Sequence, residues 1–167
     1  MIVPPVMSIT EDYDSRYRNH GLLLIRLLLT RISPLMLKRM GLNLVFMDAI
    51  KNGLRFRFDD PLVFTVQATA YSLARVLAET LLKQEKEEEI SEDEAEWLDQ
   101  CLKISVIENW VFIDDQIQAK TVVLQHIPQI IERLGLCTVR RLRVSHFAVF
   151  FATDIAYSTA SNGCCLS

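Results

Sequence analysis

Glycine and proline are scarce in this chain, with five of each among 167 residues. Both residues interrupt regular backbone, and a fold of many short strands depends on the turns that they form. Leucine, glutamate, lysine and arginine, which favour helices, are common. The composition therefore predicts a mainly α fold.

Cysteine and long apolar runs are also scarce. The four cysteines, two of them adjacent, do not form the disulfide framework of a small secreted protein, so we expect a reducing, cytoplasmic setting. The N-terminus lacks the basic and apolar segments of a secretory signal. Arg26 interrupts the most hydrophobic run, residues 22–29, which is shorter than the roughly 18–20 residues that a membrane-spanning helix needs.

Known catalytic and cofactor motifs are missing. We find no glycine-rich phosphate loop and no Gly-x-Ser-x-Gly elbow. None of the three histidines, His20, His126 and His146, has another histidine or cysteine at metal-ligand spacing. The acidic residues between Glu85 and Asp99 lack the spacing of a calcium loop. We therefore assign no catalytic residue, no metal site and no cofactor.

The chain does contain one long apolar segment, residues 60–83. Asp60 and Pro61 are suited to the N-cap and the first turn of a helix. The residues that follow include no glycine and no further proline, and their apolar side chains cover most of a helix circumference. Such a helix is usually buried. The sequence thus predicts a helical bundle around a buried central helix at about 60–83.

The segments before this helix predict further helices and a strand. Pro4 and Pro5 are expected to prevent a helix at the N-terminus. Thr10 is a candidate N-cap for a helix that reaches about Ile32 and divides at Gly21. Helices are expected at residues 34–40 and 42–52. Residues 54–58 alternate apolar and basic side chains, as a strand does, and we predict a short two-stranded β ribbon with residues 138–144.

The second half of the chain predicts three more elements. Ser91 and Glu94 form a capping box at a helix start, and residues 104–113 mix helical and strand patterns. A helix from residues 114–115 to Gly135 is expected to kink or break at Pro128. An apolar element follows at residues 145–157. We expect residues 1–159 to form one domain and residues 160–167 a polar tail.

Charge is unevenly distributed along the chain. The net charge is −3, yet the N-terminal third is rich in arginine and lysine, which could contact the phosphates of a nucleic acid. The candidate contacts are Arg16, Arg18, Arg26, Arg31, Lys38 and Arg39. The alternative is a solvated or protein-covered face. The pI of about 5.6 argues against a free-standing nucleic-acid binder.

The last four residues, Cys164 to Ser167, fit the C-a-a-X pattern for prenylation, and the terminal serine favours a farnesyl group. Cys164 is therefore a candidate lipidation site and membrane tether. A single lipid chain binds a membrane only marginally. An accidental match is the alternative.

The apolar content is high. Half of the residues are apolar and the mean hydropathy is +0.20, which indicates either a large core or apolar surface that a partner covers. Aromatic side chains are frequent anchors at such contacts. The candidate interface residues are Trp110, Phe147, Phe150 and Phe151.

The sequence favours a non-catalytic helical interaction module, a subunit or adaptor that binds a protein partner or itself. One alternative is a small helical subunit of a nucleic-acid-bound complex that uses the basic N-terminal third. Another is an enzyme whose site residues are dispersed along the chain.

Overall fold

The computed structural model describes residues 3–56, 62–82, 90–109 and 117–135. These residues form α-helices and two π-helical segments, without a strand, so the mainly α prediction is confirmed. The elements are α1 (Val3–Thr10), α2 (Ser15–Arg31), α3 (Pro34–Arg39), α4 (Leu42–Leu54), α5 (Val63–Leu77), η1 (Ala78–Leu82), α6 (Glu92–Leu102), η2 (Lys103–Asn109) and α7 (Ile117–Leu134).

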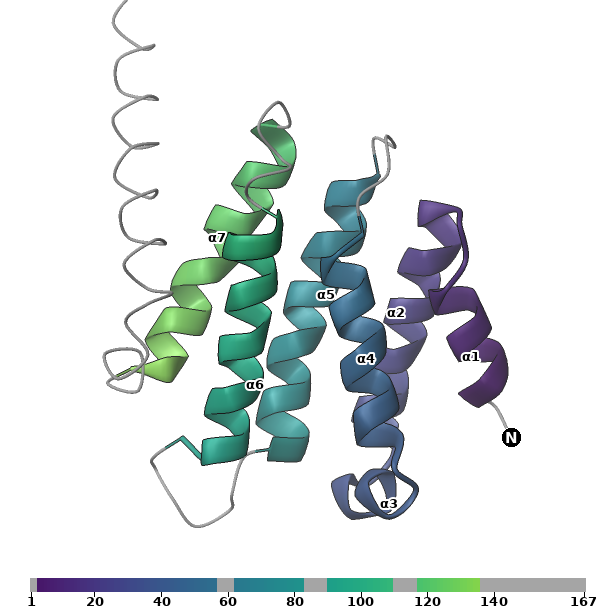
Figure 1. Ribbon diagram of the computed structural model, residues 1–167. Coiled ribbons are helices and arrows are strands. Elements are labelled where there is room, and N and C mark those ends of the chain that lie inside the picture. The colour runs from purple at the N-terminus through teal and green to yellow at the C-terminus, as the bar shows by residue number, and fades with distance from the viewer. Residues whose placement is uncertain (1–2, 57–61, 83–89, 110–116, 136–167) are drawn as a thin grey trace, which may run out of the picture.

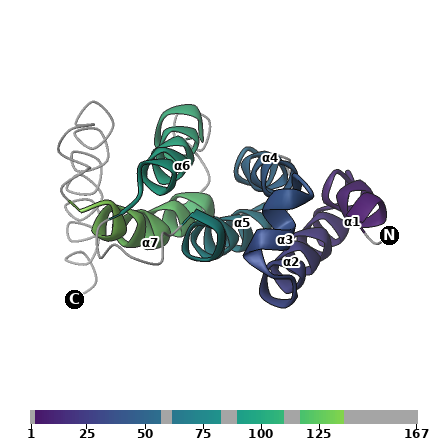
Figure 2. The same ribbon diagram turned by 90° about the horizontal axis from the view of Figure 1, so that it is seen from below.

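The longer helices stand side by side in the order of the chain (Figure 1). Seen from below, they alternate between two layers (Figure 2). Helices α1, α4 and α6 form one layer, and α2, α5 and α7 form the other. Helix α5 packs against α2, α4, α6 and α7, which makes it the centre of the bundle.

The predicted central helix is confirmed as α5 with its π-helical extension η1. Side chains such as Val66, Ala70, Leu73 and Leu77 are fully buried, and every other residue of α5 is at least half-buried. Leu62 is the N-cap of α5. The predicted cap and first-turn residues at 60–61 lie outside the described residues.

The N-terminal prediction is wrong in two respects. Pro4 and Pro5 lie in the first turn of α1, where the backbone N–H groups have no intrahelical partner and proline is tolerated. Thr10 ends α1 instead of capping α2, and its hydroxyl donates to the Met7 carbonyl at 2.7 Å. The N-cap of α2 is Asp14.

Gly21 does not divide α2, which is continuous from Ser15 to Arg31. The glycine instead lets α1 approach closely. A Cβ at this position would lie 2.6 Å from Thr10 Cγ2 and 2.7 Å from the Thr10 nitrogen. Because glycine has no side chain, α1 can pack this closely against α2.

The predicted strand at residues 54–58 is also wrong where the structure describes it. Leu54 is the last residue of α4, and the Phe56 nitrogen donates to the Gly53 carbonyl in a turn. Leu54 and Phe56 are both buried because the chain turns there, and this turn reproduces the alternation of a strand. Residues 57–58 and 138–144 lie outside the described residues, so the ribbon has no support.

The start of α6 is confirmed. Ser91 Oγ accepts the Glu94 backbone N–H at 3.2 Å. Residues 103–109 form η2, which resolves part of the ambiguous segment 104–113.

Helix α7 runs through Pro128 without a break, so the predicted break is wrong, whereas a kink at this residue stays a prediction. Pro128 is exposed, whereas Ile127, Ile130 and Leu134 are buried. Packing of this apolar stripe outweighs the one hydrogen bond that proline removes. Gly135, at φ 50°, ends the helix as predicted.

The domain limits of 1–159 and 160–167 stay predictions, because residues 136–167 lie outside the described residues. Within the described part of the chain, no helix combines the length and the apolar character that crossing a membrane requires.

Candidate functional site

Helices α2 and α3 present an unusually apolar surface to solvent. Six large apolar side chains on them are 40% to 63% exposed. We call them the α2–α3 surface: Leu23, Leu24, Leu27, Leu35, Met36 and Met40. Apolar side chains grouped in this way commonly mark a contact with another molecule.

The run of leucines in α2 explains how this surface forms. Leu22, Ile25 and Leu29 follow helical spacing and are fully buried against the core. Leu23, Leu24 and Leu27 lie on the other side of the helix and are exposed, whereas Leu28 is partly buried beside the core. Leu27, for example, is 55% exposed. The run therefore supplies both a core stripe and a solvent-facing stripe from one helix.

Two of the six predicted nucleic-acid contacts already have partners. Arg16 Nη2 lies 3.1 Å from Asp14 Oδ2. The guanidinium of Arg18 lies 4.4 Å from the centre of the Phe56 ring and donates to the Asp12 carbonyl at 3.0 Å. Burial lowers the pKa of Arg18. These two residues are thus engaged in local structure.

The other four candidates, Arg26, Arg31, Lys38 and Arg39, are exposed. At about 100° per residue, Arg26 and Arg31 project about 140° apart around α2. They do not share one helix face, as a continuous phosphate track along α2 would require. Nucleic-acid binding therefore stays a prediction.

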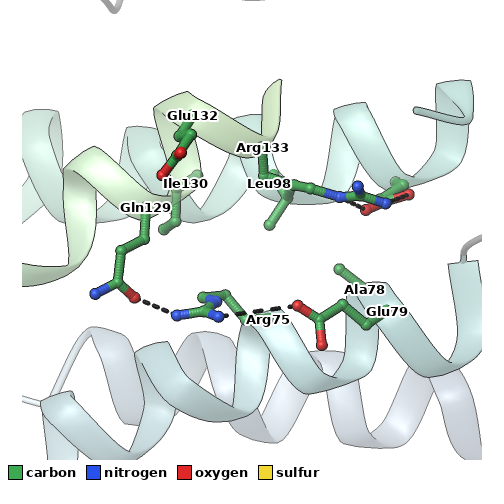
Figure 3. Close-up of a pocket in the computed structure, with 9 residues that line it drawn as sticks. Arg75, Ala78, Glu79, Leu98, Gln129, Ile130, Glu132 and Arg133 are labelled. Carbon is green, nitrogen blue, oxygen red and sulfur yellow. Dashed lines mark hydrogen bonds and ion pairs between the residues drawn. The ribbon is translucent and has the colours of Figure 1, made fainter. Parts of the chain in front are cut away.

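A second feature is a pocket of about 420 Å³ between α5 with η1, α6 and α7 (Figure 3). Arg75 of α5 donates to the Gln129 side chain of α7 and lies 3.9 Å from Glu79 of η1. On the opposite side, Arg133 of α7 binds Glu94 of α6. Polar side chains thus connect the elements around the pocket.

The Glu94 carboxylate is the most buried charge of this pocket, with a side chain only 1% exposed. Arg133 Nε lies 2.8 Å from Glu94 Oε1, and Nη2 lies 3.4 Å from Oε2. The hydrogen bond to Glu94 raises the pKa of Arg133. This two-point contact neutralises the buried carboxylate, so it holds α6 on α7.

Three titratable side chains lie near the centre of the bundle, namely Tyr71, Cys101 and His126. The rings of Tyr71 and His126 stack with centroids 5.2 Å apart. Burial and the nearby Arg75 lower the pKa of His126. Burial raises the pKa of the Cys101 thiol to about 12. The Tyr71–His126 stack could not be predicted from the sequence, because the two residues are far apart in the chain.

Several predicted site residues cannot be placed. Cys164 and the interface candidates Trp110, Phe147, Phe150 and Phe151 lie outside the described residues. In the part of the chain that the structure does describe, no group of three histidine, cysteine, aspartate or glutamate residues could hold a metal ion.

Taken together, the exposed apolar helices and the ion pairs between packed helices are typical of a helical protein that contacts other proteins. The Tti2 family matches residues 1–150. This match spans most of the 167 residues, and the chain belongs to the Tti2 family. No curated protein and no solved structure matches the chain at a significant level.

Membership in this family bears on the predicted partners. Proteins of the Tti2 family are components of a protein complex. The expectation of a protein partner is thereby confirmed, and an adaptor-like or cochaperone-like subunit without catalytic activity is supported. A nucleic acid and a membrane stay predictions.

Proposed function

We propose that this chain is a non-catalytic adaptor subunit that binds another protein of its complex through the α2–α3 surface. The observation that carries this proposal is the exposure of six large apolar side chains on two consecutive helices. Water-exposed side chains of this size gain free energy when a partner covers them, at about 25 cal/mol per Å² of apolar surface. The family membership supports the same role.

The charge around this surface indicates the partner's character. Arg31, Lys38 and Arg39 lie next to the apolar side chains, on the last turn of α2 and the last turn of α3. Acidic side chains at the edge of a partner would complement them and speed association. The proposed partner face is therefore apolar at its centre and acidic at its edge.

Replacing Leu27 with glutamate tests this proposal. The substitution places a charge among the exposed leucines of α2 without removing a buried side chain. We expect Leu27→Glu to retain the fold, measured by circular dichroism and thermal melting, and to lose most of the protein that co-purifies from cells. Gln125→Glu, on the exposed side of α7, is the matched control. Equal recovery of partners with both variants would contradict the proposal.

The predicted interface at residues 145–157, with Phe147, Phe150 and Phe151, is kept as a second contact of the adaptor. Its support is the apolar sequence of this segment. Replacing Phe150 and Phe151 with serine should weaken association with a partner, measured by the same co-purification. Unchanged association would remove this segment from the interface.

A farnesyl group on Cys164 is a further part of the proposal, supported by the C-a-a-X pattern. Such a group would shift a cytoplasmic adaptor toward membranes. Intact mass of the protein from eukaryotic cells tests this directly. A farnesyl mass gain with loss of the last three residues supports the tether, whereas an unmodified mass excludes it in that cell.

A further inference from the structure

A groove between α4 and α6 has a composition that differs from the α2–α3 surface. Both helices belong to the same layer (Figure 2), and the groove has a volume of about 400 Å³. Residues at helical spacing line its two walls. The α4 wall carries Leu44, Met47, Asp48 and Lys51, and the α6 wall carries Asp93, Glu96, Trp97 and Gln100.

The inner part of this groove is apolar. Leu44 is 68% exposed, more than any residue of the α2–α3 surface. Met47 and Leu82 are half-buried beside it. Trp97 supplies the aromatic base, where its ring is held by a hydrogen bond from Nε1 to the Ala74 carbonyl at 3.0 Å. The groove therefore has a rigid aromatic floor and an exposed leucine on one wall.

The edge of the groove is acidic. Asp48, Asp93 and Glu96 contribute three carboxylates against the single ammonium group of Lys51, which leaves a net charge of −2. Lys51 Nζ lies 5.7 Å from the centre of the Trp97 ring. Lys51 therefore already lies over this ring, which is only 1% exposed, so a partner's cations would pair with the carboxylates of the edge and not with Trp97.

We propose that the α4–α6 groove binds one face of a partner helix that carries leucine-like side chains flanked by lysine or arginine. A volume of about 400 Å³ accommodates a few side chains and not a whole helix, so the partner helix lies along the groove. Apolar anchors at i, i+3 or i+4, and i+7 are the usual contacts of such a helix. The cations pair with the carboxylates at the edge, which also select against an acidic helix.

This inference rests on the proposed adaptor function but uses a different surface. The α2–α3 surface has a basic edge, whereas the groove has an acidic edge. The two surfaces therefore select partners of opposite charge. Their failures can be separated by variants on one surface that leave the other unchanged.

The test uses the full chain and a fluorescent model peptide helix with leucines on one side and lysines beside them. A second peptide carries glutamate in place of each lysine. We expect the lysine peptide to bind and the glutamate peptide not to bind. Neutralising the edge with Asp48→Asn, Asp93→Asn and Glu96→Gln should weaken binding about tenfold, from three partly exposed charge pairs. The salt dependence of binding should also fall.

Two further variants keep the test decisive. Leu44→Ala should weaken binding of the lysine peptide at every salt concentration, because it removes an exposed apolar contact and not a charge. Leu27→Glu, on the α2–α3 surface, should leave peptide binding unchanged. If the lysine peptide fails to bind, or binds the neutralised variant equally well, the groove inference is overturned while the proposed adaptor function stands.

A photoreactive benzoylphenylalanine in place of Leu44 identifies the occupant. A crosslink to the lysine peptide supports the inference. A crosslink to another part of the same chain, or to a second copy of the chain, would show a different occupant and overturn it.

Discussion

Replacing Gly21 with alanine probes the contact between α1 and α2. The new Cβ would lie 2.6 Å from Thr10 Cγ2, 2.7 Å from the Thr10 nitrogen and 2.9 Å from Thr10 Cα. Two of these three atoms belong to the backbone. A different rotamer of Thr10 therefore cannot remove the clash, and α1 must move away from α2.

Two effects of opposite sign determine the change in the free energy of unfolding. Alanine is favoured over glycine inside a helix by about 1 kcal/mol. Forcing atoms into a closely packed contact costs about 1–3 kcal/mol, here because α1 is displaced and Val6 and Thr10, both buried, lose contacts. We expect the second effect to prevail, with a net loss of up to about 2 kcal/mol. For a chain of this size the melting temperature should fall by up to roughly 8 °C.

Urea denaturation combined with amide hydrogen exchange measures this effect. Gly21→Ala should lower the denaturation midpoint and reduce protection in α1 more than in α5. Gly53→Ala is a matched control, because its Cβ would meet the Leu22 methyl groups at 3.2 and 3.6 Å and the Ala70 Cβ at 3.1 Å, where side chains can adjust. A Gly21→Ala variant as stable as the wild type, with α1 still protected, would refute the reasoning.

Three further predictions concern buried polar groups. Arg133→Met should destabilise by about 3 kcal/mol, because it leaves the Glu94 carboxylate buried and unpaired; adding Glu94→Gln should restore part of the loss in urea denaturation. Burial lowers the pKa of His126 below its ordinary 6.5, so the unfolded chain takes up this proton at a higher pH than the folded chain does. The free energy of unfolding should therefore fall as the pH drops through 6.5. In melting experiments at several pH values, His126→Gln should flatten this dependence. Asn109→Ala should cost about 1–3 kcal/mol in thermal melting, because the buried Leu54 carbonyl loses its 2.6 Å hydrogen bond.

The parts of the fold that the sequence predicted well depend on local signals. Uninterrupted apolar residues predicted α5, a serine cap predicted the start of α6, and Gly135 predicted the end of α7. Each of these signals acts within a few residues of the feature it predicts. Tertiary packing did not need to be known.

The wrong predictions arise where a local rule was applied outside its range or tertiary packing prevailed. Proline disrupts a helix interior but not a first turn, which is why Pro4 and Pro5 fit α1. Pro128 lies inside α7, and burial of the stripe around it holds the helix together. At residues 54–56, the end of a helix is followed by a turn. Leu54 and Phe56, two positions apart in the sequence, are both buried there. Such a short alternation does not distinguish a turn from a strand.

The candidate surfaces were less predictable than the fold. Leu27 and Leu29 belong to the same run, yet one is half exposed and the other is buried. The sequence shows that both are apolar, but only the positions of α1 and α5 decide which side of α2 faces the core. The α4–α6 groove combines Leu44 with Trp97, residues that are far apart in the chain. Its shape depends on the packing of both helices on α5 and η1.

The two-layer arrangement has a consequence for an adaptor. Helix α2 belongs to one layer, whereas α4 and α6 belong to the other (Figure 2). The proposed apolar surface and the acidic groove are therefore built on different layers, with α5 packed against α2, α4 and α6. Helix α5 lines neither of the two surfaces, yet because it packs against the helices that carry them, it fixes their spacing. We accordingly expect substitutions in α5 to affect both proposed contacts together, whereas substitutions on one surface affect that contact alone.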